Sequence, residues 1–147
     1  MLTNRREIHI EWGDCDPAGI VYFPRYFEYG DACTSALFER AGFPKPKLLE
    51  TYGLAGIPLV DARARFLAAS RFGDMIAVES CIIEWGRSSF TVEHKMFCAD
   101  ALAVEIIEKR VWTVHPPGAP GTLRSQPVPE EVKARFSAAA DPLPKRS

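Results

Sequence analysis

The hydrophobic period of this chain changes from that of a strand to that of a helix and back, which restricts the folds that it can adopt. From Pro24 to Ala41, apolar residues recur every three or four positions, and this predicts one long amphipathic helix. Pro24 suits the first helical turn, and Gly42 followed by Pro44 indicates where the helix stops. The apolar stripe of this predicted helix consists of Phe23, Tyr26, Gly30, Cys33, Leu37 and Ala41.

Strand-type alternation lies on both sides of the predicted helix. Residues 6–12 place Ile8, Ile10 and Trp12 on one face and polar residues on the other, which predicts a first strand. Residues 44–56 predict an irregular connection, with a second small helix as an alternative. The remaining pattern predicts four consecutive antiparallel strands, at about residues 57–70, 74–85, 88–98 and 102–114.

One long helix and one antiparallel sheet predict a two-layer α+β domain, because the apolar stripe of the helix must be buried on the sheet. We expect a single domain over residues 1–147, with a short helix from Pro129 and a flexible tail from about residue 141. The curved sheet would wrap the helix, and its other face would still carry apolar residues. We therefore expect a second subunit, or edge-to-edge pairing of sheets, to cover that face.

Charge and cysteine patterns argue against several classes of function. The formal net charge is −1 and neither sign dominates a long stretch, so we expect no nucleic-acid or membrane partner. No run approaches the ~18 apolar residues of a membrane span, and the first residues lack a signal-peptide hydrophobic region, which favours a cytoplasmic location. Isolated cysteines predict free thiols and no metal site; they are Cys15, Cys33, Cys81 and Cys98.

The loop between the first strand and the helix carries the residues best suited to chemistry. From Trp12 to Tyr26 it reads WGDCDPAGIVYFPRY. Asp14 and Asp16 stand just ahead of a helix N-terminus, where unpaired N–H groups and the positive end of the helix dipole suit a developing oxyanion. In an isolated Asp-Pro pair, the aspartate more often accepts hydrogen bonds from nearby backbone N–H groups in a turn. The choice between this structural role and a catalytic role therefore depends on the whole run.

This run resembles the signature of the 4-hydroxybenzoyl-CoA thioesterase family, and the resemblance continues more loosely through residues 5–114. It implies a hotdog fold, assembled as dimers or a homotetramer, that hydrolyses the thioester of an acyl- or aroyl-CoA. It also implies that Asp16 is the catalytic carboxylate, as nucleophile or general base, and that the Phe23 backbone N–H polarises the carbonyl oxygen. No cofactor is expected, because coenzyme A is part of the substrate.

Further candidate residues would contact the substrate. Tyr22 and Tyr26 belong to an aromatic cluster that could form the wall of an acyl pocket, although their helical spacing also fits a core. Asp31 lies two helical turns into the helix, where a buried carboxylate needs a partner; it could orient the loop or contact substrate. The family's basic cluster after Glu84-Trp85 is reduced here to Arg87, our expected contact for a coenzyme A phosphate.

Other chemically competent side chains fit structural roles better. Asp14 is expected to cap the loop, and Cys15 lacks the histidine partner of a cysteine nucleophile. The histidines at positions 9, 94 and 115 are expected on the surface or in the core rather than as bases. Solvated strand positions are expected for Arg63, Arg65, Lys109 and Arg110.

Two other functions would use the same groove. A hydratase or dehydratase would bring an Asp-His pair on a loop and helix, and no histidine lies between residues 14 and 31. A non-catalytic module that binds acyl-CoA or an acyl carrier protein would have little need of a carboxylate near the thioester carbonyl. The sequence leaves open the acyl group, the acyl carrier and the choice between dimer and tetramer.

Overall fold

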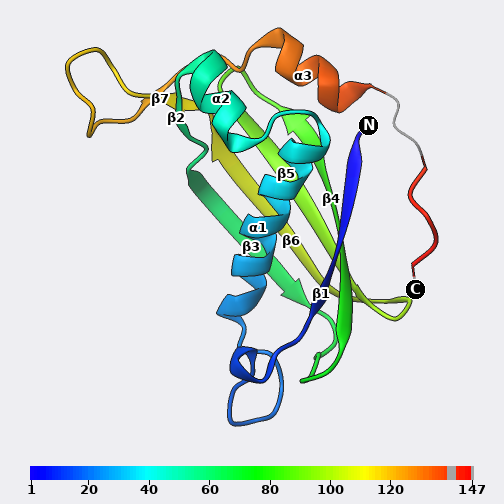
Figure 1. The fold of residues 1–147 in the computed structure, drawn as a ribbon. Coiled ribbons are helices and arrows are strands. Elements are labelled where there is room, and N and C mark those ends of the chain that lie inside the picture. The colour runs from blue at the N-terminus through cyan, green and yellow to red at the C-terminus, as the bar shows by residue number, and fades with distance from the viewer. Residues whose placement is uncertain (139–141, 147) are drawn as a thin grey trace.

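The computed structural model describes residues 1–138 and 142–146 (Figure 1). The tail is predicted to be flexible from about residue 141. Two of its positions, 141 and 147, lie outside the described residues. None of the helices formed by the described residues is long and apolar enough to cross a membrane. The elements are β1 (Thr3–His9), η1 (Trp12–Asp14), α1 (Pro24–Arg40), α2 (Lys45–Tyr52), β2 (Leu54–Gly56), β3 (Leu59–Phe66), β4 (Met75–Trp85), β5 (Ser89–Cys98), β6 (Ala101–Val111), β7 (Thr113–Val114), β8 (Arg124–Ser125) and α3 (Glu130–Ser137).

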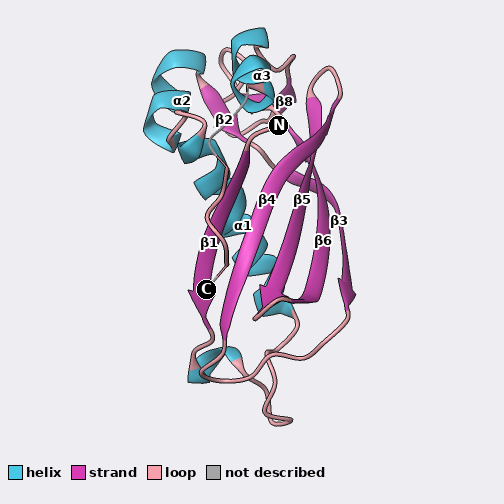
Figure 2. Cartoon of the chain, turned by 90° about the vertical axis from the view of Figure 1, so that its right-hand side faces the viewer, coloured by secondary structure: helices cyan, strands magenta, loops and turns pink. Residues whose placement is uncertain are grey.

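Five antiparallel strands form the main sheet in the order β1-β4-β5-β6-β3, and α1 lies along one of its faces (Figures 1 and 2). Strands β2, β7 and β8 form a smaller sheet at one end. These two layers confirm the predicted α+β class. The strand order does not follow the chain, because β3 pairs with β6 and forms an edge of the sheet, whereas β4 pairs with β1.

The long helix α1 has the predicted extent and buries most of the predicted stripe. Tyr26 and Leu37 are almost fully buried on the sheet, whereas Phe23, which precedes the first turn, is 57% exposed. Gly30 lies against the sheet where a β-carbon would come within 3.4 Å of the ring of His94. The helix therefore approaches the strands closely at its middle.

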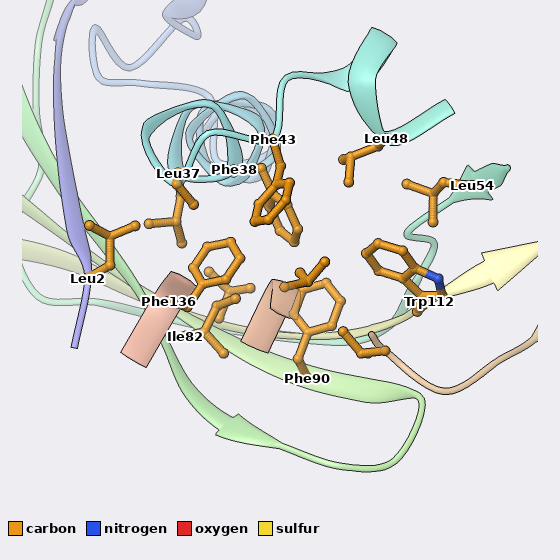
Figure 3. Close-up of a cluster of buried hydrophobic side chains, with 14 residues drawn as sticks. Leu2, Leu37, Phe38, Phe43, Leu48, Leu54, Ile82, Phe90, Trp112 and Phe136 are labelled. Carbon is orange, nitrogen blue, oxygen red and sulfur yellow. The ribbon is translucent and has the colours of Figure 1, made fainter. Parts of the chain in front are cut away.

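A cluster of aromatic residues closes the core at the C-terminal end of α1 (Figure 3). The ring of Phe38 packs against Phe90 and Phe136, with centroid distances of 5.7 and 4.8 Å. Because Phe136 belongs to α3, the predicted short helix near the C-terminus seals this end of the two layers. A second apolar cluster, which includes Ile10, Val21 and Tyr26, lies at the other end of α1.

The first strand ends earlier than predicted. Ile10 is 2% exposed, and its N–H donates to the Asp74 carbonyl oxygen at 2.9 Å, outside the β1 ladder. The chain then turns through η1, so Trp12 is 77% exposed and packs edge-on against Phe72. The predicted place of Trp12 on the buried face is therefore wrong, because the turn at Gly13 interrupts the alternation.

The face of the sheet away from α1 carries charged as well as apolar side chains. Alternation along the strands places charged side chains there, and they include Glu79, Glu93, Lys95, Glu105 and Lys109. Arg146 also lies on this face, 2.7 Å from the Glu79 carboxylate and over the Phe97 ring. The expected covering of this face by a second subunit or by another sheet stays a prediction. Exposed apolar side chains also follow the edge strand β3 and its continuation, at Leu59, Val60, Phe66 and Leu67.

Candidate functional site

A tight turn after η1 positions Asp16. The Asp16 N–H donates to the Ile20 carbonyl oxygen at 2.9 Å, and the Gly19 N–H donates to the Asp16 carbonyl oxygen at 2.9 Å. Gly19 has φ = 80°, a left-handed conformation that favours glycine. The Asp16 Oδ1 accepts a hydrogen bond from the Ala18 N–H at 2.9 Å. Its Oδ2 accepts no hydrogen bond from residues 1–138 and 142–146.

Neighbouring contacts hold this turn against the rest of the fold. The Tyr22 N–H donates to the Asp14 carbonyl oxygen at 2.8 Å, and the Val21 N–H donates to the carbonyl oxygen of buried Ser70 at 2.9 Å. The Asp14 carboxylate accepts the Glu11 N–H at 3.0 Å. These bonds give Asp14 the structural role expected for it and leave Asp16 as the less constrained carboxylate.

Helix α1 begins directly after the turn and leaves one backbone donor unused. The Arg25 N–H donates to the Tyr22 carbonyl oxygen at 2.9 Å, and the Tyr26 N–H donates to the Phe23 carbonyl oxygen at 3.1 Å. Pro24 has no N–H to donate. Within the described part of the chain, the Phe23 N–H has no acceptor. A free N–H at the positive end of a helix suits a developing negative charge.

An apolar cavity of about 270 Å³, which we call the loop cavity, opens beside this turn. It is bounded by the start of α1 and by the segment that follows β3. Burial raises the pKa of Tyr26 more than its contact with Ser70 lowers it, so the phenol stays neutral at neutral pH. The residues that line the loop cavity are Ile20, Val21, Phe23, Tyr26, Phe66, Leu67, Ala68 and Ala69.

A second cavity of about 360 Å³, which we call the helix cavity, lies along the middle of α1 and is bounded by α2 and β2. Its polar lining includes Asp31, Thr34 and Arg110. Lys45 and Glu39 add charge to the same lining. Most of its wall is apolar and consists of Phe38, Phe43, Leu48, Leu54, Ile57, Pro58 and Leu123.

The polar corner of the helix cavity differs from what the sequence predicts. The Asp31 side chain is 71% exposed rather than buried, and its Oδ1 accepts a hydrogen bond from Arg110 Nη2 at 2.8 Å. Arg110 is 5% exposed rather than solvated. The expected burial of Asp31 and the expected solvation of Arg110 are wrong, because Arg110 occupies an inward-facing position of β6 and its guanidinium extends to the surface of α1. The substrate contact expected for Asp31 stays a prediction.

Arg110 belongs to a buried hydrogen-bond network. Its Nε and Nη2 lie 3.2 and 3.0 Å from the two carboxylate oxygens of Glu108. Glu108 Oε1 also accepts the Thr34 hydroxyl at 2.7 Å and lies 2.9 Å from His94 Nε2. His94 Nδ1 lies 2.6 Å from the Ser80 hydroxyl. The network therefore joins α1 to three strands, and Glu108 and His94 are almost fully buried.

The charges in this network are matched. Burial alone would raise the pKa of Glu108, but hydrogen bonds from His94 and Arg110 and the charge of the guanidinium lower it to about 2. Burial alone would lower the pKa of Arg110, but Glu108 and Asp31 raise it. Both groups are ionised at neutral pH, and each compensates the other for the loss of water.

Comparison with known proteins assigns the family. The family model described as "Thioesterase-like superfamily" matches residues 10–136. The chain belongs to the thioesterase-like superfamily. A curated relative, 4-hydroxybenzoyl-CoA thioesterase of Pseudomonas sp. strain CBS-3, is 40% identical over 89 residues, which are 59% of this chain and 62% of the relative. The aligned region thus spans less than two thirds of that relative's length.

Solved structures agree with this thioesterase-like assignment over nearly the whole chain. The 4-hydroxybenzoyl-CoA thioesterase of Pseudomonas sp. strain CBS-3 superposes with a TM-score of 0.83 and 30% identity, covering 92% of this chain and 99% of that one. A mutant of 4-hydroxybenzoyl-CoA thioesterase complexed with 4-hydroxybenzoyl-CoA superposes with a TM-score of 0.86 and 29% identity, with the same coverage of both chains. A gentisyl-coenzyme A thioesterase superposes with a TM-score of 0.78 and 27% identity, covering 92% of this chain and 100% of that one. The hotdog fold is therefore confirmed.

The candidate residues of this thioesterase-like protein fall into separate groups. Phe23 and Tyr26 line the loop cavity, and half-exposed Tyr22 directly precedes Phe23. Asp16 does not line this cavity but lies on the turn that contributes Ile20 and Val21 to it. Asp31 lies at the other cavity. Arg87 follows β4, and β4 runs from beside the end of β1 toward its start, so Arg87 lies at the opposite end of the sheet from the Asp16 turn. A single copy of the chain does not bring all these residues together.

Two sets of residues were missed by the sequence analysis of this thioesterase-like protein. Residues 66–69 line the loop cavity, but they fell inside a predicted strand. The buried network was missed as well, although a signal was present: His94 alternates with buried Val92 and Met96. A polar residue at a core position of a strand period marks a buried network.

Proposed function

We propose that this protein hydrolyses an acyl-CoA or aroyl-CoA thioester to a free acid and coenzyme A. The observation that carries the proposal is a turn with a free Asp16 carboxylate oxygen that leads into a helix start with a free Phe23 N–H, next to an apolar cavity. The names of the relatives support it, since they describe thioesterases for hydroxybenzoyl and gentisyl groups. The reaction needs no cofactor.

Asp16 and the Phe23 N–H would divide the chemistry between them. In one version the Asp16 carboxylate attacks the thioester carbonyl, the C–S bond breaks, and coenzyme A leaves as a thiolate that takes a proton from water. Water then hydrolyses the resulting anhydride. In the other version, Asp16 removes a proton from the water that attacks. The Phe23 N–H donates to the oxyanion in both versions.

We propose that the site is completed by a second copy of the chain, paired through β3. This strand is an edge of the sheet and carries exposed Leu59 and Val60. The unpaired backbone N–H and C=O groups of an edge strand can form hydrogen bonds with a strand of another chain. The helix cavity lies before the start of β3, and the loop cavity lies at its end. Antiparallel pairing of two β3 strands would set the helix cavity of one copy beside the loop cavity of the other.

In this homodimer the substrate contacts would come from both copies. Tyr22 and Tyr26 would lie near the thioester, while Asp31 of the other copy would face the acyl group. Arg87 of the other copy would approach the coenzyme A phosphates, because the antiparallel arrangement reverses the ends of the sheet. A homotetramer would need a further contact between dimers. A monomer in solution at working concentrations would contradict this part of the proposal.

Thiol release from a panel of aroyl-CoA and aliphatic acyl-CoA thioesters tests the function. We expect hydrolysis by the wild type and a loss of at least about 100-fold in Asp16→Asn, which changes the charge but hardly the shape. Asp100→Asn is the matched control, since this carboxylate is 91% exposed on the β5–β6 turn. Equal rates in Asp16→Asn and wild type would exclude Asp16 as catalyst. Binding without hydrolysis by the wild type would favour a non-catalytic binding module.

A further inference from the structure

Residues 142–146 lie against the face of the sheet away from α1, which we call the outer face. This face carries Glu79, Glu93, Lys95, Glu105 and Lys109. The segment runs past β1 (Figures 1 and 2), and Arg146 Nε lies 3.7 Å from the Asp100 carboxylate on the β5–β6 turn. The match to the thioesterase-like family model ends at residue 136, so this match assigns no role to the segment.

Arg146 anchors the segment across two strands. Its Nη1 lies 2.7 Å from the Glu79 carboxylate on β4, and its guanidinium lies 3.9 Å from the centroid of the Phe97 ring on β5. Arg5 of β1 lies 3.3 Å from the same Glu79 carboxylate and donates to the Pro144 carbonyl oxygen. Because these charged side chains are only 12–25% exposed, salt screens their attraction less than it screens a fully exposed pair.

The segment occupies the layer in which a second sheet would have to lie. Two sheets that pack face to face are about 10 Å apart, and their side chains fill the space between them. A backbone segment and a second sheet therefore exclude each other from the same part of the face. We propose that residues 142–146 are an intramolecular cover, which competes with a second copy of this chain for the outer face around Glu79 and Phe97.

The outer face suits a second copy of itself. Outside the contacts of the cover it carries charges of both signs, at Glu93, Lys95, Glu105 and Lys109. A two-fold axis sets a side chain of one copy opposite a different side chain of the other, so a face of mixed charge can match itself. The cover thus closes this face and leaves contacts between copies to other surfaces, such as the edge strand β3.

A charge reversal tests the cover in the full chain. Arg146→Glu sets a carboxylate against Glu79 and removes the cation from the Phe97 ring, so the segment should be released about tenfold more often. A second copy binds only where the segment is released, so the association constant of the outer face should rise by the same factor. Sedimentation equilibrium at increasing protein concentration measures this rise, as a mass that approaches twice that of the wild-type assembly.

Two further variants separate the ion pair from a general effect of charge. Lys145→Glu makes the same change of charge at the neighbouring exposed position and should keep the wild-type mass. Glu79→Arg combined with Arg146→Glu again places one carboxylate between two guanidiniums, because Arg5 remains. This double variant should return the mass toward the wild-type value.

An added cysteine shows which face the copies use. A bismaleimide should join two copies through Glu93→Cys in the Arg146→Glu background, and the yield should be much lower with Arg146 in place. Each protein without the added cysteine is the control, since the chain has four cysteines of its own. An unchanged mass in Arg146→Glu, or equal cross-linking with and without Arg146, would overturn the inference. Neither readout uses thioester hydrolysis, so a failure of the catalytic proposal would leave this result unaffected.

Discussion

The Asp16 turn and the Arg110 network lie along the same helix but are built in opposite ways. The turn is held by backbone hydrogen bonds between residues that are close in the chain, and Asp16 remains partly exposed. The network is held by side chains from α1 and three strands, and its central Glu108 is 1% exposed. A side-chain change should therefore affect chemistry at the turn, whereas in the network it should affect the stability of the fold.

The largest effect on stability should follow from Arg110→Met. This change leaves the Glu108 carboxylate buried without its cation, which should cost about 3–5 kcal/mol in the free energy of unfolding. Asp16→Asn should change the same quantity by less than about 0.5 kcal/mol, because that side chain is partly exposed. Urea unfolding at neutral pH measures both. Comparable losses in the two variants would contradict the contrast between the two regions.

The stability of the network should also depend on pH. The pKa of Glu108 is about 2 in the folded protein, against 4.5 for an unperturbed glutamate. A folded-state pKa below the unfolded value means that ionised Glu108 stabilises the fold fully above pH 4.5, and that this stability is lost as the pH falls toward 2. The unfolding free energy of the wild type should therefore fall more steeply over this range than that of Glu108→Gln. Parallel curves would show that Glu108 is not the group responsible.

At the turn, the backbone rather than a side chain should be sensitive. Gly19→Ala places a β-carbon on a left-handed residue with φ = 80°, which should cost about 1–2 kcal/mol. Thiol release should fall too, because the turn that aims Asp16 would relax. Gly13→Ala is the control, since its φ is not positive and nothing lies within 4 Å of an added β-carbon. If the two alanine variants unfold at the same urea concentration, a β-carbon at Gly19 does not carry the expected cost.

The smallest effect should come from Trp12→Ala. Trp12 is exposed and packs edge-on against Phe72 with a centroid distance of 5.6 Å, so its removal should cost less than about 1 kcal/mol. Ile10→Ala, two residues earlier, removes a buried side chain and should cost about 2–5 kcal/mol. The melting temperatures of the two variants show which change costs more stability. A reversed ranking would mean that Trp12 is buried in the protein in solution.

Local features of this molecule could be predicted from the sequence. The bounds of α1 follow from its apolar period, from Pro24 at its start and from Gly42 beyond its end. The turn at Asp16 follows from Asp, Pro and Gly residues that satisfy their own backbone groups. These features depend on neighbours in the chain, so the pattern of neighbours is enough to find them.

Features that depend on distant parts of the chain were missed. Arg110 was expected in solvent because no single segment shows that Asp31 is 79 residues away in the chain and 2.8 Å away in space. The pairing of β3 with β6, rather than with the next strand, joins segments that are far apart in the chain, so no local pattern predicts it. Trp12 was misplaced for the opposite reason, because the strand pattern was extended through a turn.

The position of β3 has a genetic consequence. If two copies pair through this strand, each site would combine the Asp16 turn of one subunit with Asp31 in the helix cavity of the other. A subunit with Asp16→Asn and a subunit with Asp31→Asn would then complement each other: the mixed dimer would have one site with both defects and one with neither. Co-expression of the two variants should restore up to half of the wild-type activity in the mixed dimers.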